Sequence, residues 1–365
     1  MKKNIIFFLH NLNVGGAEKN FINYANYLSN KNINVKIICL SAKGILKRNI
    51  NRKVKVIDLN KKKLKFSIFS ILKIINSTKP DILFSSLLHI SLLLCFFKKM
   101  NFIKAKLFLR PSNVMLNNHI LTNNKPNYLI IFLTNLFLRY ADLFFCISDN
   151  IFKELQLLKV PTNKIIKINN AIVDNDFYIK SKQPFKNNRI QNITDYILSI
   201  GRLTEQKNHL MLLKSFIQIK KKYKKKLLLV LIGEGHLKEN LKNFVKLNKI
   251  ENDVIFLKNL KNVLNYIRSC KLFIQTSLWE GQPNVLIEAL LLKKQVIATN
   301  CPGQSKNNLD LFTNCHFLKK NSIDNLSKTI LYFLNKKKHT LKVNKTSNYS
   351  INNSGKIILD VIKEN

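Results

Sequence analysis

From Leu272 to Leu290 the chain reads LFIQTSLWEGQPNVLIEAL, and this segment is the most informative about its architecture. The first residues, Leu-Phe-Ile-Gln, are typical of a short buried strand. A polar loop follows, and Pro283 fits the first position of a helix, where the N–H that proline lacks is not needed. The apolar residues after it predict a buried helix. The segment therefore predicts a strand, a loop and a helix in direct succession.

The same alternation of short apolar runs and amphipathic stretches extends outward in both directions. In the second half the expected strands and helices are Tyr196–Ile200, His209–Lys222, Leu227–Ile232, His236–Leu247, Val254–Leu257, Leu272–Gln275, Asn284–Leu292 and Gln295–Ala298. In the first half they are Ile5–Leu9, Ala17–Leu28, Val35–Leu40, Val54–Ile57, Ile68–Asn76, Ile82–Phe84, Ala105–Leu109 and Leu143–Ile147. Such alternation predicts parallel sheets with helices on both faces.

The 365 residues are enough for two α/β domains, each with its own core. The alternation pauses at 178–193, a polar stretch that is typical of an interdomain linker. We therefore expect a first domain over 1–177, a second over 194–345, and a helical segment over 346–365 that packs back on the first. Ligands of doubly wound sheets bind beyond the carboxyl ends of the strands, so we expect the two domains to face each other across a cleft.

The segment Leu272–Leu290 contains two carboxylates and the expected start of a helix. Asn284 and Glu288 are four residues apart and share one face of the expected helix, whereas Glu280 lies in the preceding loop. The first N–H groups of the helix, on Asn284, Val285 and Leu286, are a natural site for a phosphate or a sugar hydroxyl. Glu288 alone would be interpreted as an ordinary surface glutamate, but the whole string favours a binding site.

A second string, Ser199–His209, reads SIGRLTEQKNH and lies where a strand ends and a helix begins. Arg202 and Lys207 flank a tight turn, where an arginine fork and a lysine point charge can grip a diphosphate. The chain has 62 basic residues, so two nearby cations mean little by themselves. Most of these residues are lysines, however, and an arginine directly after Gly201 is the more specific signal.

A third string, Asn11–Lys19, reads NLNVGGAEK and joins the first expected strand to the first expected helix. Gly15 and Gly16 would let the backbone approach a ligand closely. Taken alone, this pair of glycines is equally consistent with an ordinary strand-to-helix turn.

Together the three strings resemble the motifs of the retaining glycosyltransferases of family 4, the group 1 transferases. Glu280 and Glu288 have the spacing of that family's E-x7-E motif, with its Glu-Gly-x-Pro-Asn start and its Glu-Ala-Leu end. The second string is similar to the family's Gly-Arg-Leu-x-x-x-Lys-Asn motif, and the third to its Gly-Gly-Ala-Glu motif. The resemblance implies the GT-B fold, in which two doubly wound, Rossmann-like α/β domains face each other across a cleft.

The resemblance also implies a role for each motif. In the family the second glutamate binds the ribose of the donor and the first lies near the transferred sugar, which gives these roles to Glu288 and Glu280. Arg202 and Lys207 would bind the donor pyrophosphate and neutralise the leaving group. The Gly-Gly pair would form the wall that faces the donor phosphate and sugar.

Three weaker matches extend the resemblance over nearly the whole chain: Ile232–Gly235, Ala141–Ser148 and Ile168–Asp174 are similar to a Gly-x-Gly turn, an Ala-Asp…Ser strand end and an Asn-Gly-x-Asp loop of the family.

The sequence also departs from the family. Lys258 and Lys293 stand where the family has glycine, and Asn307 stands where it often has glutamate. Many relatives have a histidine or glutamate after the fourth or fifth strand, whereas this chain has Leu109–Asn113, LRPSN. These departures keep open the alternative of a catalytically impaired protein that still binds a nucleotide sugar.

Candidates for the acceptor or sugar side are His10, at the end of the first expected strand, and Ser112 and Asn113, after the fifth. His89 lies in an apolar helical stretch and is interpreted as a packed core histidine. The histidines and cysteines do not have the spacing of metal ligands, so no metal site is expected.

The reaction that the resemblance implies is retaining transfer of a hexose or N-acetylhexosamine from a nucleotide sugar, with a UDP sugar as the expected donor. The diphosphate would leave, stabilised by Arg202, Lys207 and the helix start at Asn284. The acceptor hydroxyl would attack the same face and pass its proton to the departing phosphate oxygen. The scheme needs no metal or other cofactor. The expected acceptor is a lipid-linked or cell-surface glycan, such as a bacterial lipopolysaccharide.

The chain is strongly basic, with 62 Lys and Arg against 20 Asp and Glu and a formal net charge of +42. Biased codon usage in an AT-rich genome would explain the many Lys, Asn and Ile residues, but it does not explain why acidic residues are so few. The lysines of Lys61–Lys65 and Lys98–Lys106, beside apolar residues, predict docking to anionic lipids. A nucleic-acid-binding protein is the rival interpretation of the charge, but interleaved aromatic residues and a known binding module are lacking.

The remaining features bear on the compartment. The six scattered cysteines are typical of buried, reduced thiols. Ile5–Leu9 is too short for a signal peptide, and Ile82–Phe97 falls short of the ~20 apolar residues of a spanning helix. We therefore expect a cytoplasmic protein, peripheral on the inner face of the cytoplasmic membrane. A GT-B epimerase is a further alternative, against which the paired cations and carboxylates of the two strings argue.

Overall fold

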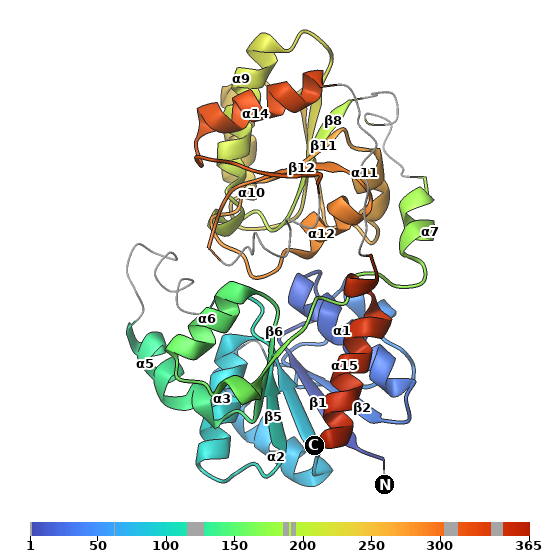
Figure 1. Cartoon of the computed structure of the whole chain (residues 1–365), viewed down its shortest axis with the longest axis vertical. Coiled ribbons are helices and arrows are strands. Elements are labelled where there is room, and N and C mark those ends of the chain that lie inside the picture. Colours follow the sequence, from blue (N-terminus) through green and yellow to red (C-terminus); the bar gives the residue numbers. More distant parts are fainter. Residues whose placement is uncertain are drawn as a thin grey trace. The chain divides into compact units, whose positions relative to one another are not determined.

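The computed structural model describes residues 2–61, 63–114, 128–184, 190, 195–302, 313–336 and 346–365. The chain divides into two compact units, Met1–Ile172 with Ser347–Asn365, and Val173–Thr346. Each unit is an α/β structure built on one parallel sheet (Figure 1). The expected class, with helices alternating with parallel strands, is confirmed in both.

The first unit contains a seven-stranded sheet with the order β3-β2-β1-β4-β5-β6-β7. Its strands are β1 (Asn4–Leu9), β2 (Asn34–Cys39), β3 (Lys55–Asp58), β4 (Ile82–Ser85), β5 (Lys106–Leu109), β6 (Leu143–Cys146) and β7 (Ile165–Lys167). Its α-helices are α1 (Gly16–Ser29), α2 (Ile68–Thr78), α3 (Leu88–Lys99), α5 (Tyr128–Phe137), α6 (Asp149–Leu157) and α15 (Ile351–Glu364). Short 3-10 turns are η1 (Ile45–Asn49), η2 (Leu64–Phe66), η3 (Leu138–Tyr140) and η4 (Thr162–Lys164).

The second unit contains a six-stranded sheet with the order β10-β9-β8-β11-β12-β13. Its strands are β8 (Tyr196–Ile200), β9 (Leu228–Ile232), β10 (Val254–Leu257), β11 (Leu272–Gln275), β12 (Gln295–Ala298) and β13 (Cys315–Phe317). Its helices are α7 (Phe177–Lys182), α9 (His209–Lys222), α10 (Lys238–Leu247), α11 (Leu264–Ser269), α12 (Asn284–Leu291) and α14 (Ile323–Asn335), and η5 (Glu205–Lys207) is a 3-10 turn. A further turn, η6 (Thr346–Tyr349), leads back to the first unit.

Both sheets reverse their strand order once, between β1 and β4 in the first unit and between β8 and β11 in the second. At such a switch point the loops that follow the two central strands diverge to opposite faces, and the crevice at the carboxyl ends is where doubly wound sheets bind ligands. The strings at 11–19, 199–209 and 276–290 all begin at the carboxyl end of one of these central strands.

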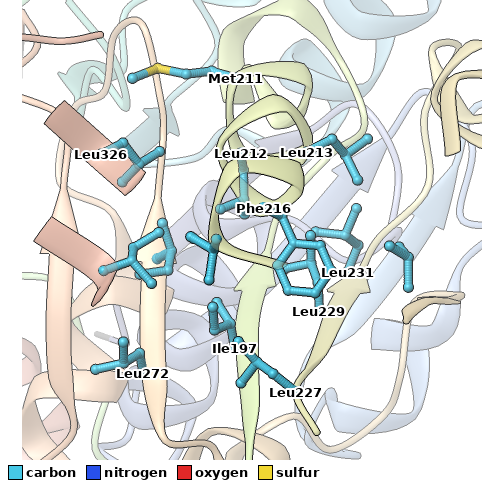
Figure 2. Packing of buried hydrophobic residues seen from close by; sticks show 14 of the residues in the cluster. Ile197, Met211, Leu212, Leu213, Phe216, Leu227, Leu229, Leu231, Leu272 and Leu326 are labelled. Carbon is cyan, nitrogen blue, oxygen red and sulfur yellow. The ribbon is translucent and has the colours of Figure 1, made fainter. Parts of the chain in front are cut away.

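A hydrophobic cluster holds β8, β11 and α9 in place in the second unit (Figure 2). Ile197 of β8, Leu229 of β9 and Leu272 of β11 line one face of the sheet, and Phe216 of α9 packs over them. Helix α14 contacts α9 and adds Leu326 to the same cluster. Because Phe216 is fully buried, truncating such a residue to alanine costs about 3–5 kcal/mol. The ends of β8 and β11 are therefore fixed by packing.

The last helix returns to the first unit, where α15 packs against α1 (Figure 1). Gly355 makes this contact close, because a Cβ there would lie 2.5 Å from Cδ1 of Tyr27. Ser354 Oγ donates a hydrogen bond to the carbonyl of Asn169 at 3.0 Å, and Lys3 Nζ donates to the carbonyl of Ile362 at 2.6 Å.

The division between the units falls at Ile172, whereas the sequence suggested a linker over 178–193. The start of that stretch forms helix α7, which packs against α11. Phe177 is buried, and Asn262 Nδ2 donates to the carbonyl of Lys180 at 2.8 Å and to Oε1 of Gln183 at 3.1 Å. The described start of this stretch is therefore held by the buried Phe177 directly before it and by side-chain hydrogen bonds to Asn262.

Two further findings concern the whole chain. All six cysteines are free thiols, and all but Cys315 are buried. Burial raises the pKa of Cys39 and Cys95 to about 12, which makes them unreactive at neutral pH. Among the described residues, no helix has both the length and the apolar character needed to cross a bilayer.

Candidate functional site

The two loops at the switch point of the second sheet are joined to each other. Thr276 Oγ1 donates to the carbonyls of Lys207 at 2.9 Å and Asn208 at 3.0 Å. Gln206 accepts from the backbone N–H of Leu278 at 2.8 Å, and its Nε2 donates to the carbonyl of Trp279 at 3.0 Å. These hydrogen bonds join two strings that are far apart in the sequence, since Gln206 and Trp279 are separated by 73 positions.

A second turn supports the loop after β8. Gly201 N–H donates to the carbonyl of Ile232 at 3.0 Å, and Leu203 N–H donates to that of Glu234 at 3.0 Å. Gly233 has a φ of +156°, and a Cβ there would lie 1.9 Å from the carbonyl oxygen of Gly201. Only glycine allows this approach, so the Gly-Glu-Gly turn is the support on which the Gly-Arg-Leu loop rests.

Lys207 and Glu280 form the central ion pair of the site. Lys207 Nζ lies 2.5 Å from Glu280 Oε1, and Glu280 is only 4% exposed. The same oxygen accepts hydrogen bonds from Ser277 Oγ at 2.5 Å and from Gln275 Nε2 at 3.2 Å. A Cβ on Gly201 would lie 3.1 Å from the stem of Lys207, so this glycine leaves room for the lysine to reach across. In this state the charge of Lys207 is balanced by a carboxylate.

Arg202 is exposed, in contrast to Lys207. Its Nη2 donates to Oε1 of Gln206 at 2.8 Å, which orients the guanidinium on the loop. Among the described residues no carboxylate forms an ion pair with Arg202. It is therefore an oriented cation with N–H groups available to an anionic ligand.

Helix α12 begins at Asn284, directly after Pro283, and its first turn belongs to the same site. Asn284 and Glu288 are buried, with 8% and 2% of their surfaces exposed, and both interact with their surroundings. Leu286 is also buried and Val285 is half-buried. The backbone N–H groups of this first turn have no carbonyl of the helix four residues before them.

His209 is a residue of this region that the sequence did not single out. It follows Asn208, which has a left-handed backbone with φ 46°, a conformation that asparagine tolerates better than most residues. His209 is fully buried at the start of α9, and its Nδ1 has no hydrogen-bond partner among the described residues. Burial, and to a lesser extent the charge of Lys207, lowers its pKa to about 3. His209 is therefore neutral at physiological pH.

Two models of protein families match the chain, one after the other. The model described as Glycosyltransferase Family 4 matches residues 14–175, and the model described as Glycosyl transferases group 1 matches residues 180–350. The two matches together reach into both units and include the strings at 199–209 and 272–290 and residues 14–19 of the string at 11–19.

The chain belongs to the group 1 glycosyltransferases.

Curated relatives agree with this assignment. An uncharacterized glycosyltransferase of Methanocaldococcus jannaschii is 32% identical over 64% of this chain and 59% of its own length. One of Haemophilus influenzae is 27% identical over 91% of each chain. A Campylobacter jejuni protein named N-acetylgalactosamine-N,N'-diacetylbacillosaminyl-diphospho-undecaprenol 4-alpha-N-acetylgalactosaminyltransferase is 37% identical over 29% of this chain and 28% of that one.

Solved structures show the same fold. The structure of Anabaena HepE, solved in complex with UDP and glucose, superposes with a TM-score of 0.76 at 15% identity and covers 98% of this chain and 99% of that one. The glycosyltransferase described here therefore has the GT-B fold.

The first unit of this glycosyltransferase carries the expected acceptor-side residues. His10 follows β1 and is half-buried, and Ser112 and Asn113 follow β5 and are half-buried as well. The prediction that His89 is a core residue is wrong, because its side chain is exposed. It lies in the first turn of α3, and its ring meets that of His10 edge-on with centroids 5.8 Å apart. Surrounding protein atoms, and then His10, lower the pKa of His89.

The Gly-Gly pair is part of the first turn of α1. The side chain of Glu18 folds back over Gly15, where a Cβ would lie 2.0 Å from its Oε2. Gly16 is the first residue of the helix. In this state the space above Gly15 is used by a carboxylate of the chain itself.

The departures from the family lie at distinct places in the glycosyltransferase. Lys258 is exposed after β10. Lys293 has a φ of 58° just after α12, the left-handed conformation for which glycine is preferred. Asn307 lies outside the described residues. In the part of the chain that is described, no group of His, Cys, Asp and Glu side chains has the arrangement of a metal site.

Arg110 is a second residue that the sequence did not single out. It directly follows β5 and is the largest fully buried side chain among the described residues. Its Nη2 donates to Oδ1 of Asn170, and its guanidinium lies 5.8 Å from the ring centroid of Tyr24. In a chain with this many basic residues, the residue types alone do not reveal that an arginine at a strand end is buried.

Proposed function

We propose that this glycosyltransferase is a retaining enzyme that transfers a hexose or N-acetylhexosamine from a UDP sugar to a lipid-linked or glycan acceptor. The observation that supports the proposal is that the loops after β8 and β11, which carry Arg202, Lys207 and Glu280, are joined by hydrogen bonds and by the Lys207–Glu280 ion pair. Diphosphate binding at a switch point next to a helix start is the arrangement expected of a nucleotide site.

The leaving group would be stabilised by protein cations. Arg202 is exposed and oriented, so it binds the diphosphate directly, and the first turn of α12 adds N–H groups. Lys207 is held by Glu280 and reaches the diphosphate from that fixed position. Glu288 is assigned to the donor ribose. This scheme uses no metal or other cofactor.

Glu280 is poorly suited to act as a nucleophile. Its Oε1 atom is paired with the Lys207 ammonium and accepts hydrogen bonds from Ser277 and Gln275. These contacts stabilise the negative charge and so make the carboxylate a weaker nucleophile. A mechanism without a covalent enzyme intermediate is therefore favoured. In it the acceptor hydroxyl attacks the face from which the diphosphate departs and passes its proton to the departing phosphate oxygen.

The comparisons support the choice of donor and acceptor. HepE, which shares the fold, was solved with UDP and glucose. The Campylobacter jejuni relative is named for a transfer to a saccharide on diphospho-undecaprenol. By analogy we assign a UDP sugar as donor and a saccharide on a prenyl diphosphate as acceptor.

The location that we propose is the inner face of the cytoplasmic membrane, through an apolar and basic surface on the first unit. Helices α3 and α5 pack against each other and expose several large apolar side chains. We define the α3–α5 patch as Phe96, Met100, Phe102, Tyr128, Leu129 and Phe132, with Lys99 and Lys104 beside them. Aromatic residues next to lysines suit the interface of an anionic bilayer.

The proposed function is tested first by nucleotide binding and then by the anomeric configuration of the product. UDP should bind to the wild type in calorimetry, and a panel of UDP sugars with a short prenyl-diphosphate-linked saccharide should identify the donor. Retention is read from the anomeric configuration of the product by NMR. Arg268→Ala, which removes an exposed arginine of α11, serves as a matched control for Arg202→Ala. An inverted product, or UDP affinity that survives in Arg202→Ala, would contradict the proposal.

A further inference from the structure

Arg110 has hydrogen-bonding capacity that the protein does not satisfy. Its side chain is 1% exposed, and both Nε and Nη1 are buried without a hydrogen-bond partner among the described residues. A guanidinium carries five N–H donors. Among the described residues, Nη2 donates to the amide oxygen of Asn170, and the Tyr24 hydroxyl also accepts a hydrogen bond from the guanidinium.

The charge of Arg110 is also unbalanced. Among the described residues no carboxylate forms an ion pair with it. Its neighbours are the ring of Tyr24 and the side chain of Asn170, both of which are neutral. Keeping a charge out of water without a counter-charge is unfavourable, and so is leaving N–H groups unpaired. An arrangement of this kind needs a reason beyond packing.

A second buried donor lies at the next strand end. Ser86 Oγ is buried and has no partner among the described residues. β4 and β5 are paired in register, Ser85 with Leu109, and Arg110 N–H donates to the carbonyl of Ser85 at 2.9 Å. The Ser91 hydroxyl of α3 donates to the Ser85 hydroxyl at 3.0 Å, so the Ser85 side chain is directed toward α3. The Arg110 side chain lies against Tyr24 of α1 instead. Because side chains alternate between the faces of a strand, Ser86 is expected on the face of Arg110.

The position of this pair is that of a ligand site. Both residues lie at the carboxyl edge of the first sheet, next to the β1–β4 switch point, where doubly wound sheets bind ligands. A guanidinium and a hydroxyl both offer donors, so the fitting ligand is an anion rich in acceptor oxygens. Phosphate and diphosphate groups have these properties.

We propose that Arg110, together with Ser86, binds a phosphoryl group in the first unit, namely the diphosphate that links the acceptor saccharide to its lipid. The inference rests on the proposed function for the identity of the acceptor. The diphosphate of the nucleotide is the other source of the same chemistry, and the experiment separates the two.

The experiment is calorimetric titration of the full chain with inorganic pyrophosphate and with farnesyl diphosphate, in the presence of saturating UDP. In the wild type both ligands should bind while UDP occupies the second unit. Arg110→Met should weaken both by at least about 10-fold, as expected from the loss of a charge-assisted contact. Arg110→Lys should keep part of the affinity, and Ser86→Ala should lose less than Arg110→Met. Arg139→Met, which removes an exposed arginine of the same unit, should change nothing.

The outcomes are distinct. Loss of pyrophosphate and farnesyl diphosphate binding in Arg110→Met, with UDP affinity intact, supports the acceptor diphosphate. Loss of UDP affinity in Arg110→Met shows that the nucleotide is the source and overturns the acceptor assignment. If Arg110→Met binds pyrophosphate, farnesyl diphosphate and UDP each as tightly as the wild type does, the proposed phosphoryl site is wrong. Should Arg110→Met fail to fold, Arg110→Lys and Ser86→Ala decide between the same outcomes. The UDP affinity of Arg202→Ala tests the proposed function separately.

Discussion

Glu280 and Lys207 illustrate how the candidate site balances its own charges. The carboxylate holds the lysine through a short ion pair and is itself fixed by Ser277 and Gln275. A diphosphate that arrives must share Lys207 with this carboxylate. The pair therefore positions the cation while weakening its attraction for the nucleotide.

Replacing Glu280 by Gln tests this competition. The amide keeps the shape of the side chain but releases the charge of Lys207, so UDP affinity should rise by roughly 3-fold or more. Turnover should fall, because a group near the transferred sugar can act differently on the ground and transition states. Calorimetry with UDP and kcat with an established donor and acceptor are the measurements. A variant with wild-type kcat would remove Glu280 from the mechanism.

Arg202 should contribute more to nucleotide affinity than Lys207. Arg202→Ala removes an exposed cation whose hydrogen bond within the described part of the chain goes to Gln206, and the Kd for UDP should rise about 10-fold or more, equivalent to roughly 1.5–3 kcal/mol. Lys207→Ala also leaves the buried Glu280 without its cation, so it should lower the urea midpoint as well as the affinity. The idea fails if both variants bind UDP as the wild type does in calorimetry, with Arg268→Ala as reference.

Helix α12 shows why one departure from the family does not disturb the proposed donor site. Lys293 N–H donates to the carbonyl of Leu290 at 2.9 Å, and Lys294 N–H donates to that of Ala289 at 2.9 Å. With φ 58° at Lys293 this is a Schellman ending. The glycine of the family is thus replaced by a residue that adopts the same conformation at an energetic cost.

Lys293→Gly should therefore stabilise the protein. Relief of the left-handed conformation, offset by the greater freedom of glycine in the unfolded chain, should give about 0.5–1 kcal/mol. The increase should be seen as a higher midpoint in urea, without a change in UDP affinity. Lys294→Gly is the control, since this neighbour does not have a positive φ. A lower midpoint for Lys293→Gly than for the control would contradict the explanation.

The start of α9 should make the protein sensitive to acid. His209 has a folded-state pKa of about 3, whereas the unfolded chain binds the proton at about 6.5. Below pH 6.5 the unfolded state is protonated first, so stability is lost as pH falls, by about 1.4 kcal/mol per pH unit until the folded pKa is reached. His209→Gln should flatten the pH dependence of the urea midpoint between about pH 6.5 and 4.5. Parallel curves for the two proteins would show that the pKa of His209 is the same in the folded and unfolded states, which would contradict the lowered folded-state pKa.

The sequence predicted strands and helices well where burial is continuous. Tyr196–Ile200, Leu272–Gln275 and Gln295–Ala298 have the expected bounds, because such runs are fully or mostly buried in a parallel sheet. β7 and β13 were not predicted, since each is a three-residue strand at the edge of its sheet. Short edge strands carry little hydrophobic signal.

The site was predictable only in part, for a related reason. Motif residues such as Arg202 and Glu280 are recognisable in the sequence, but the ion pair between Lys207 and Glu280 depends on which strands are neighbours. Arg110 and His209 matter because some of their buried nitrogen atoms have no hydrogen-bond partner in the described part of the chain, and no pattern of residue types reveals that. His89 was misread because the first turn of an apolar helix can extend beyond the sheet that it covers.

Two explanations account for the net charge of +42. Either biased codon usage scatters lysines over the whole surface, or lysines are concentrated on one surface that docks to a membrane. The structure corrects the set of lysines that the sequence suggested. Lys98 is partly buried, where it pairs with Asp142 and donates to the carbonyl of Ala105 at 2.9 Å, so it supports the fold and is not available to lipid. Lys99 and Lys104 are exposed next to the apolar side chains of the α3–α5 patch.

Lys99 and Lys104 changed together to Gln should therefore weaken binding to anionic vesicles. Each lysine near an anionic surface contributes about 1 kcal/mol, so the pair should account for about a 30-fold loss. Lys224 and Lys225 are exposed lysines of the second unit, and changing both to Gln removes the same charge far from the patch in sequence. Cosedimentation with liposomes of increasing anionic fraction is the measurement, with and without about 0.5 M salt, which shortens the Debye length to a few ångströms. If the two double variants lose binding equally, or if the wild type stays in the supernatant on strongly anionic vesicles at low salt, the lysines reflect composition and the α3–α5 patch is not a docking surface.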